Sequence, residues 1–97
     1  MLIFNDERAN STSEVFQHRG GPLQVQVIGL VNGVANESLN GITVQIQVRQ
    51  DLLEWRSLDS GLFNTPDLVI LDAKANTEFR AVISGQSGNN GITLSFI

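Results

Sequence analysis

Apolar and polar residues alternate along much of this chain, and the alternation is clearest between residues 42 and 48. The sequence there reads Ile-Thr-Val-Gln-Ile-Gln-Val, in which four β-branched apolar residues are separated by three polar ones. A period of two puts the apolar side chains on one face of an extended segment, which predicts a half-buried β-strand. The opposite, polar face continues to Arg49 and suits either solvent or a neighbouring subunit.

Six further segments carry strand signals, and turn residues separate them. They are residues 13–19, 23–31, 55–58, 67–71, 77–84 and 92–97. Asn32-Gly33 and Asn40-Gly41 predict turns, because both residue types tolerate positive φ. The connection between these turns has room for one short strand. The alternation of residues 23–31 breaks at Ile28-Gly29, which predicts a bulge or bend.

These signals together predict an all-β protein. About seven strands with turns roughly every ten residues favour an antiparallel sandwich or barrel. Strands this short must bury one face against a second sheet, and 97 residues fit a single domain. Residues 62–66 predict a loop whose two apolar residues dock on the body. For residues 50–58 the sequence is compatible with either extended chain or one helical turn.

The N-terminal residues 1–13 differ from the rest of the chain. Leu2-Ile3-Phe4 is a short apolar patch, and a polar stretch follows it up to residue 13. Two interpretations stay open: a contact arm outside the domain, or an ordinary first strand at a sheet edge. We therefore divide the chain into an N-terminal arm or edge segment, residues 1–13, and one β-sandwich domain, residues 14–97.

Composition removes several classes of function. The chain has no cysteine, which excludes disulfides, thiolate catalysis and cysteine metal sites. The net charge is -4 and the six basic residues form no stripe, which argues against nucleic-acid binding. No apolar run reaches membrane-spanning length. We expect no nucleic-acid partner, no membrane partner and no cofactor.

The candidate catalytic residues are few. His18 is the single histidine, so a triad or a histidine metal site has no second member. The acidic pairs Asp6-Glu7 and Asp51/Glu54 lie in predicted turns, where carboxylates commonly cap and solvate the backbone. The glycine-rich stretch 85–91 lacks the Lys-Ser/Thr pair of a phosphate loop. We expect a protein that is not an enzyme and that has no catalytic or metal-binding residues.

Trp55 is the single tryptophan and has two interpretations. It is either a core anchor, as large aromatic residues beside strands commonly are, or a platform for stacking a sugar. Arg56 and Arg80 each follow an aromatic residue on a predicted strand. We expect both to point outward and to pair with acids across a sheet or an interface.

Two parts of the sequence carry a resemblance. Residues 42–58 combine an alternating strand, a turn with an acid and a tryptophan, and residues 71–85 contain Phe79-Arg80-Ala81-Val82-Ile83-Ser84-Gly85. Together they resemble the middle and the E–F corner of immunoglobulin-like and fibronectin-type sandwiches. Phe79 stands where those families have a tyrosine, and their cysteine pair is absent. The second run, in a chain this short, is similar to small β-sandwich virion proteins of tailed bacteriophages.

This resemblance implies an antiparallel immunoglobulin-like sandwich and a structural role in the virion. The expected function is capsid decoration or cementing by protein–protein adhesion, with the major capsid protein or another virion protein as partner, and with homo-oligomers. The alternatives are a carbohydrate-binding or host-adhesion module and a tail-associated structural protein. The residues predicted to contact a partner are Leu2, Ile3, Phe4, Val15, Phe16 and Arg19.

Overall fold

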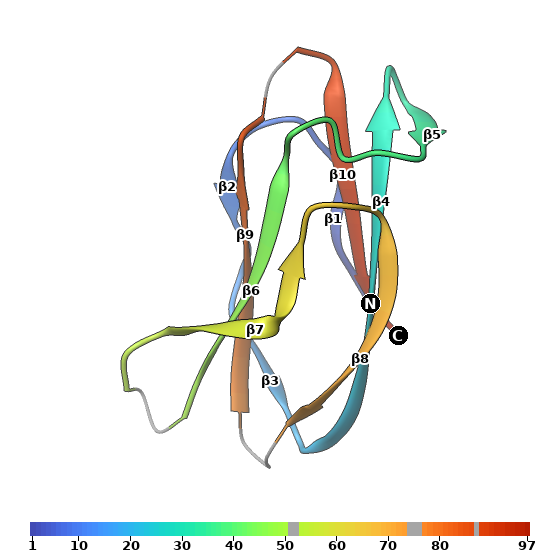
Figure 1. Cartoon of the computed structure of the whole chain (residues 1–97). Helices are drawn as coiled ribbons and strands as arrows, with labels where there is room; N and C mark the ends of the chain where they lie inside the picture. Colours follow the sequence, from blue (N-terminus) through green and yellow to red (C-terminus); the bar gives the residue numbers. More distant parts are fainter. Residues whose placement is uncertain (51–52, 74–76, 87) are drawn as a thin grey trace.

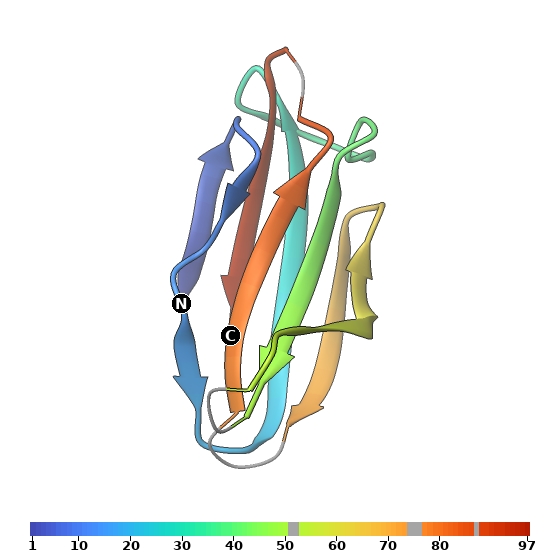
Figure 2. The ribbon, with the colours of Figure 1, turned by 90° about the vertical axis from the view of Figure 1, so that its left-hand side faces the viewer.

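The computed structural model describes residues 1–50, 53–73, 77–86 and 88–97. These residues form two antiparallel sheets packed face to face in a body of 38 × 22 × 21 Å, shown in two orientations in Figures 1 and 2. The expected all-β antiparallel sandwich is confirmed. Ten strands lie within the described ranges instead of about seven, because the N-terminal segment and the 32–41 connection contribute short strands.

Sheet A contains the longest strand of the fold and both ends of the chain. Its strands are β1 (Leu2–Glu7), β10 (Asn90–Phe96), β4 (Gly21–Val31), β5 (Val34–Asn36) and β8 (Asp67–Ala73). They lie in the order β1, β10, β4, and the free side of β4 is shared by β8 along its first part and β5 along its last part. The two edges of sheet A are therefore β1 on one side and β5 with β8 on the other.

Sheet B covers the opposite side of the core. Its strands are β2 (Ser11–Thr12), β3 (Phe16–His18), β9 (Thr77–Ser84), β6 (Thr43–Arg49) and β7 (Arg56–Phe63). β6 lies between β9 and β7, and the short strands β2 and β3 both pair with the other side of β9. The segment with the clearest alternation is thus an interior strand that leads into a hairpin, as predicted.

The strand pairings are nested along the chain. β1 pairs with β10, β2 and β3 pair with β9, β4 pairs with β8, and β6 pairs with β7. A long hairpin that rolls up on itself gives this order, and the rolling brings β4 beside β10 and β6 beside β9. This is the jelly-roll arrangement of a β-sandwich. The connectivity differs from that of an immunoglobulin domain, whose last two strands share a sheet, because here β9 and β10 lie in different sheets.

The core lies between the inward faces of the two sheets. Val44 and Ile46 of β6 are fully buried, and Val48 packs against the same core at its edge. The alternation along residues 42–48 therefore places side chains as predicted. The buried apolar residues of the core are Phe4, Leu23, Val25, Val27, Leu39, Ile42, Val44, Ile46, Phe63, Leu71, Phe79, Ala81, Ile83, Ile92, Leu94 and Phe96.

The two Asn-Gly turns are confirmed, and of the predicted bulge or bend at Ile28-Gly29 the bulge is wrong. Asn32 and Gly33 have φ of 51° and 79°, and Asn40 and Gly41 have φ of 58° and 83°. β4 continues without a register shift through Gly29, which lies opposite Ile92 of β10. A Cβ atom at Gly29 would lie 2.4 Å from the Ser38 carbonyl oxygen. The glycine therefore permits a close approach of the 32–41 connection to the strand.

Two predicted connections also differ from the structure. β7 extends to Phe63, so Leu62 and Phe63 belong to a strand instead of a docked loop, and Phe63 is 3% exposed. Of the ambiguous stretch 50–58, residues 51–52 lie outside the described residues, and residues 53–55 precede β7 without forming a helix.

The N-terminal segment is an edge of sheet A. β1 pairs with β10 over Leu2–Glu7, and the backbone nitrogen of Phe96 donates a hydrogen bond to the carbonyl oxygen of Met1. The predicted strand 13–19 is shorter than expected, since β3 covers Phe16–His18. Of the two interpretations of residues 1–13, the structure shows an edge strand, β1, followed by the short strand β2.

We expect Val44→Asp to leave little folded protein. Val44 is 0% exposed, and the substitution removes about 1.5–3 kcal/mol of apolar burial and places a carboxylate in the core. Thr43→Asp is the matched control on the outward face and should change stability by about 1 kcal/mol or less. Thermal unfolding followed by circular dichroism distinguishes the two, and equal melting temperatures would contradict the assigned faces.

Candidate interaction surfaces

The residues predicted to contact a partner divide into an inward and an outward set. Phe4 is 7% exposed and belongs to the core, and Ile3 and Phe16 pack against the core. Phe16 lies between Phe79 and Phe96, with ring centres 6.0 and 4.4 Å away. The other three predicted residues are exposed: Leu2, Val15 and Arg19.

A groove runs between β1 and the segment that contains β2 and β3. It is lined by residues of 1–4 and 11–16 together with Glu7, so five of the six predicted contact residues meet there, and Arg19 lies apart. Leu2 and Val15 are 55% and 44% exposed. Ile3, Phe4 and Phe16 point toward the core. Their main role is therefore to cover the core at the edge of the sandwich between β1 and β3.

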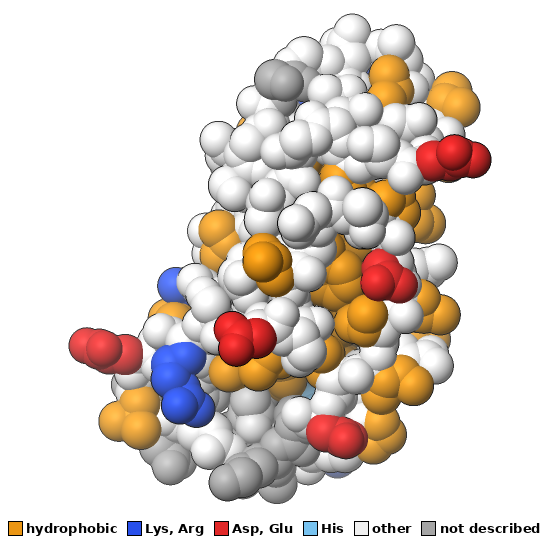
Figure 3. Space-filling model, viewed as in Figure 1, with side chains coloured by type: hydrophobic (Ala, Val, Ile, Leu, Met, Phe, Trp, Pro, Cys, Tyr) orange, Lys and Arg blue, Asp and Glu red, His pale blue; other side chains and the backbone are white. Residues whose placement is uncertain are grey.

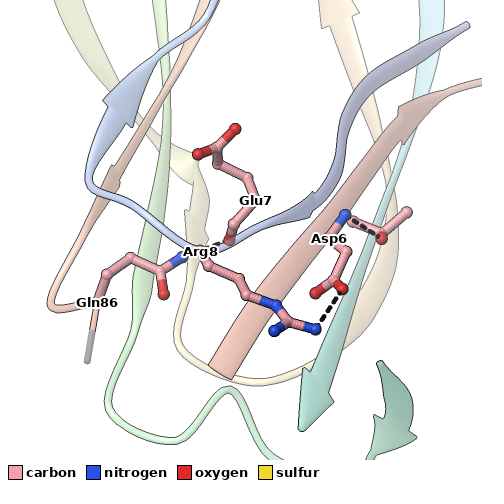
Figure 4. Close-up of polar contacts among 5 residues, drawn as sticks. Asp6, Glu7, Arg8 and Gln86 are labelled. Carbon is pink, nitrogen blue, oxygen red and sulfur yellow. Dashed lines mark hydrogen bonds and ion pairs between the residues drawn. The ribbon is translucent and has the colours of Figure 1, made fainter. Parts of the chain in front are cut away.

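The acidic residues Asp6 and Glu7 stabilise the turn after β1. The Asp6 carboxylate accepts a hydrogen bond from Arg8 at 2.9 Å, and the Asp6 backbone nitrogen donates to Thr93 Oγ1 at 3.1 Å (Figure 4). The hydrogen bond and the charge of Asp6 raise the pKa of the Arg8 guanidinium above its ordinary value. A carboxylate oxygen of Glu7 accepts from the backbone of Ala9 at 3.3 Å.

Gln86 connects the same turn to the chain before β10. Its side-chain nitrogen donates to the Glu7 carbonyl oxygen at 2.8 Å, and its backbone nitrogen donates to Asn10 Oδ1 at 2.9 Å. Asp6 Oδ1 and Gln86 Oε1 are buried without a hydrogen-bond partner among the described residues. They lie on opposite sides of Arg8 in Figure 4, so they do not converge on one ligand. Ser87, in the glycine-rich stretch 85–91, lies outside the described residues.

The other candidate catalytic residues lie apart from one another. His18 donates from Nε2 to the Gly21 carbonyl oxygen at 3.1 Å and packs edge-on against Phe79. Asp51 of the predicted Asp51/Glu54 pair lies outside the described residues. Within the described ranges, no group of three or more His, Cys, Asp or Glu side chains is placed to hold a metal ion.

Trp55 packs on two arginines at the outer face of sheet B. The guanidinium carbons of Arg49 and Arg80 lie 4.5 and 4.4 Å from the centre of the indole ring. Arg49 is held by Glu78, with Nε 3.1 Å from Oε1, and Arg80 donates from Nε to the side-chain oxygen of Gln47 at 2.7 Å. Trp55 is half-buried and does not belong to the core. Arg80 thus points outward as predicted, but it is bonded to an amide, and Arg49 makes the ion pair.

The outer face of sheet A combines apolar and mostly neutral polar side chains along β4, β8 and β10. The register of β4 with β8 places Leu68 opposite Gln26 and Ile70 opposite Gln24, and these two apolar side chains are 53% and 62% exposed. In Figure 3, hydrophobic side chains gather on the side of the molecule where β8 and β4 run. The outward side chains of β4, β8 and β10 are Pro22, Gln24, Gln26, Ile28, Leu30, Leu68, Ile70, Asp72, Thr93 and Ser95.

Asp72 is the charged member among the outward side chains of β4, β8 and β10, and none of these is a lysine or an arginine. At the β1 side of sheet A, the Asp6 carboxylate lies over Gly91 of β10 and is paired with Arg8. Sequence reasoning did not identify this face, although the alternation predicted outward polar residues on residues 23–31. The segment 67–71 is apolar at both inward and outward positions. Its sequence therefore predicted a strand without showing that Leu68 and Ile70 would be exposed.

No protein-family model, curated protein or solved structure matches this chain. The described residues contain no helix of the length and apolar character needed to cross a membrane. The function is therefore inferred from the surfaces of this chain itself.

We expect Gly91→Ala to destabilise the protein through Asp6. A Cβ atom at Gly91 would lie 1.8 Å from Asp6 Oδ1, and such overpacking costs about 1–3 kcal/mol. The same substitution in an Asp6→Ala background should cost clearly less, because the carboxylate is gone. Urea unfolding of the four proteins gives the coupling energy. Additive effects would show that the carboxylate does not lie over Gly91.

We expect Arg80→Ala to expose Trp55. Its emission should shift to longer wavelength and be quenched more strongly by acrylamide, since a guanidinium contact is removed. The loss of this cation–π contact should cost about 0.5–1 kcal/mol of stability. Arg19→Ala is the matched control, as Arg19 is exposed. An unchanged emission spectrum in Arg80→Ala would contradict the packing of Trp55.

Proposed function

We propose that this protein is a non-enzymatic structural protein of a virion, and that it decorates or cements the capsid by adhesion to other proteins. The observation that supports this proposal best is the outer face of sheet A. Leu68 and Ile70 are exposed there beside neutral glutamines, with no lysine or arginine on the outward side of β4, β8 or β10. Depletion of charge is typical of the centre of a protein–protein interface.

The energetics of this face favour adhesion. Covering an exposed Leu or Ile side chain contributes up to about 1.5–3 kcal/mol, and here each is already partly covered. Glutamine, serine and threonine side chains can form hydrogen bonds across an interface without the desolvation cost of a buried charge. A sheet also loses little backbone conformational entropy when it binds, because the strand pairing already fixes its backbone.

The fold agrees with this role but does not decide it. Jelly rolls occur in viral capsid proteins and also in lectins, so the argument depends on the surface of this chain. The aromatic side chains are all buried or half-buried, and Trp55 is packed against arginines. We therefore favour protein partners, namely the major capsid protein or another virion protein, over a carbohydrate. Homo-oligomers would match the repeated sites of a symmetric shell.

We expect mass spectrometry to find the chain in purified particles produced from the genome that encodes it. Immunogold labelling should place it on the head, since the proposal assigns it to the capsid. Leu68→Lys/Ile70→Lys should strongly reduce the copies per particle, because the substitutions charge the proposed contact face. Leu62→Lys, at a leucine of sheet B that is 49% exposed, is the matched control.

Absence of the chain from the particles would contradict the proposal. Labelling confined to the tail would replace capsid decoration by the tail-associated alternative. Equal loss of copies in the Leu62→Lys control would show that the outer face of sheet A is not the contact.

A further inference from the structure

β8 is an edge of sheet A, and the Leu68 N–H that faces away from β4 is bonded to a carboxylate of its own strand and not to another strand. β8 pairs with β4 over seven consecutive residues, Asp67–Ala73, without a register shift, and no described strand pairs with its other side. The backbone nitrogen of Leu68 donates to its neighbour Asp67 Oδ1 at 2.7 Å. Since N–H groups alternate in direction along a strand, the N–H groups of Leu68 and Ile70 both face away from β4.

The other edges of the two sheets carry features that oppose pairing with a further strand. β1 has two register shifts, and its Asp6 has a φ of 49°. β7 has a register shift opposite Ile46. β2, β3 and β5 are two or three residues long. Bulges and short length are protections that proteins use at sheet edges. β8 is regular, seven residues long and free of lysine, proline and glycine.

The charges at the ends of β8 indicate what kind of strand would fit. Asp67 and Asp72 are exposed at the two ends, with the exposed apolar side chains Leu68 and Ile70 between them. Five residues of extended chain separate the two Cα atoms by about 17 Å, and side chains five positions apart point to opposite faces of the sheet. Asp72 therefore lies on the outer face, and Asp67, opposite Val27, on the core side at the end of the strand. A complementary strand would carry Lys or Arg near each end and apolar residues at alternate positions between, because opposite charges across a strand pair attract.

We propose that β8 accepts an extended segment of a partner protein as an additional antiparallel strand of sheet A, and that this segment has basic residues five positions apart. The inference rests on the proposed adhesive function and specifies the partner segment. Main-chain hydrogen bonds provide the affinity in this mode of recognition, and the side chains provide specificity. A second copy of this chain fits less well, because its own β8 would bring no basic residue to the pair.

The test uses the full-length chain labelled with nitrogen-15 and a synthetic peptide, acetyl-Arg-Thr-Ile-Thr-Val-Lys-amide. Antiparallel pairing would place its basic ends opposite Asp72 and Asp67, and Ile and Val opposite Ile70 and Leu68. We expect saturable amide shifts confined to β8 and the adjacent part of β4. The acidic-ended peptide acetyl-Glu-Thr-Ile-Thr-Val-Glu-amide should bind at least about tenfold more weakly.

A charge-reversed variant, Asp67→Lys/Asp72→Lys, should invert this preference and bind the acidic-ended peptide more tightly. The variant's far-ultraviolet circular dichroism provides the check that it is folded. Absence of shifts at millimolar peptide, or shifts located on β1 or β7, would overturn the proposal. Shifts of β8 that depend on protein concentration without peptide would also overturn it and indicate a second copy as the occupant.

These outcomes are separate from those of the proposed function. If Leu68→Lys/Ile70→Lys reduces the copies per particle while the peptide leaves β8 unaffected, adhesion through the face stands and strand addition is wrong. If the peptide binds β8 but the chain is absent from virions, strand addition stands and the virion role is wrong.

Discussion

The structure depends on burial of one alternating apolar face between two sheets. The chain has no cysteine to form disulfides, so packing has to hold the sheets together. Val44, Ile46, Ile92 and Leu94 are fully buried at the centre of this packing. Because a strand alternates strictly, fixing these side chains inward also fixes which side chains point outward. The chemistry of the outer surfaces is therefore a direct consequence of the core.

The two outer faces that result are chemically different. On sheet B, charged and amide side chains of β6 and β9 bond to one another beside one exposed leucine, Leu62 of β7: Arg49 pairs with Glu78, Arg80 with Gln47, and Trp55 packs on both arginines. On the β4 and β8 part of sheet A, exposed apolar side chains lie beside neutral amides, with Asp72 as the charged side chain and no lysine or arginine. A self-satisfied polar face gains little from a partner, whereas an apolar face gains from being covered. This contrast favours sheet A and its β8 edge as the contact surface.

The sequence predicted local features well and long-range features poorly. The alternation at 42–48 and the turn at Asn40-Gly41 depend on neighbouring residues, and both are as expected. The roles of Gly29, Phe4 and Trp55 depend on groups far away in the chain: the Ser38 carbonyl, the core and two arginines. Periodicity does not indicate which strands pair, so it did not reveal that β9 and β10 lie in different sheets. In the sequence, an apolar residue that is buried in the core also looks the same as one that contacts a partner protein.

The central claim is that the protein binds its partner through the outer face of sheet A and the β8 edge. Amide hydrogen exchange, compared between the free chain and the chain bound to particles, tests it most directly. The account predicts slower exchange on binding for the amides of β8 that face away from β4, with little change in β7. Unchanged exchange in β8, together with new protection along the groove between β1 and β3, would contradict it.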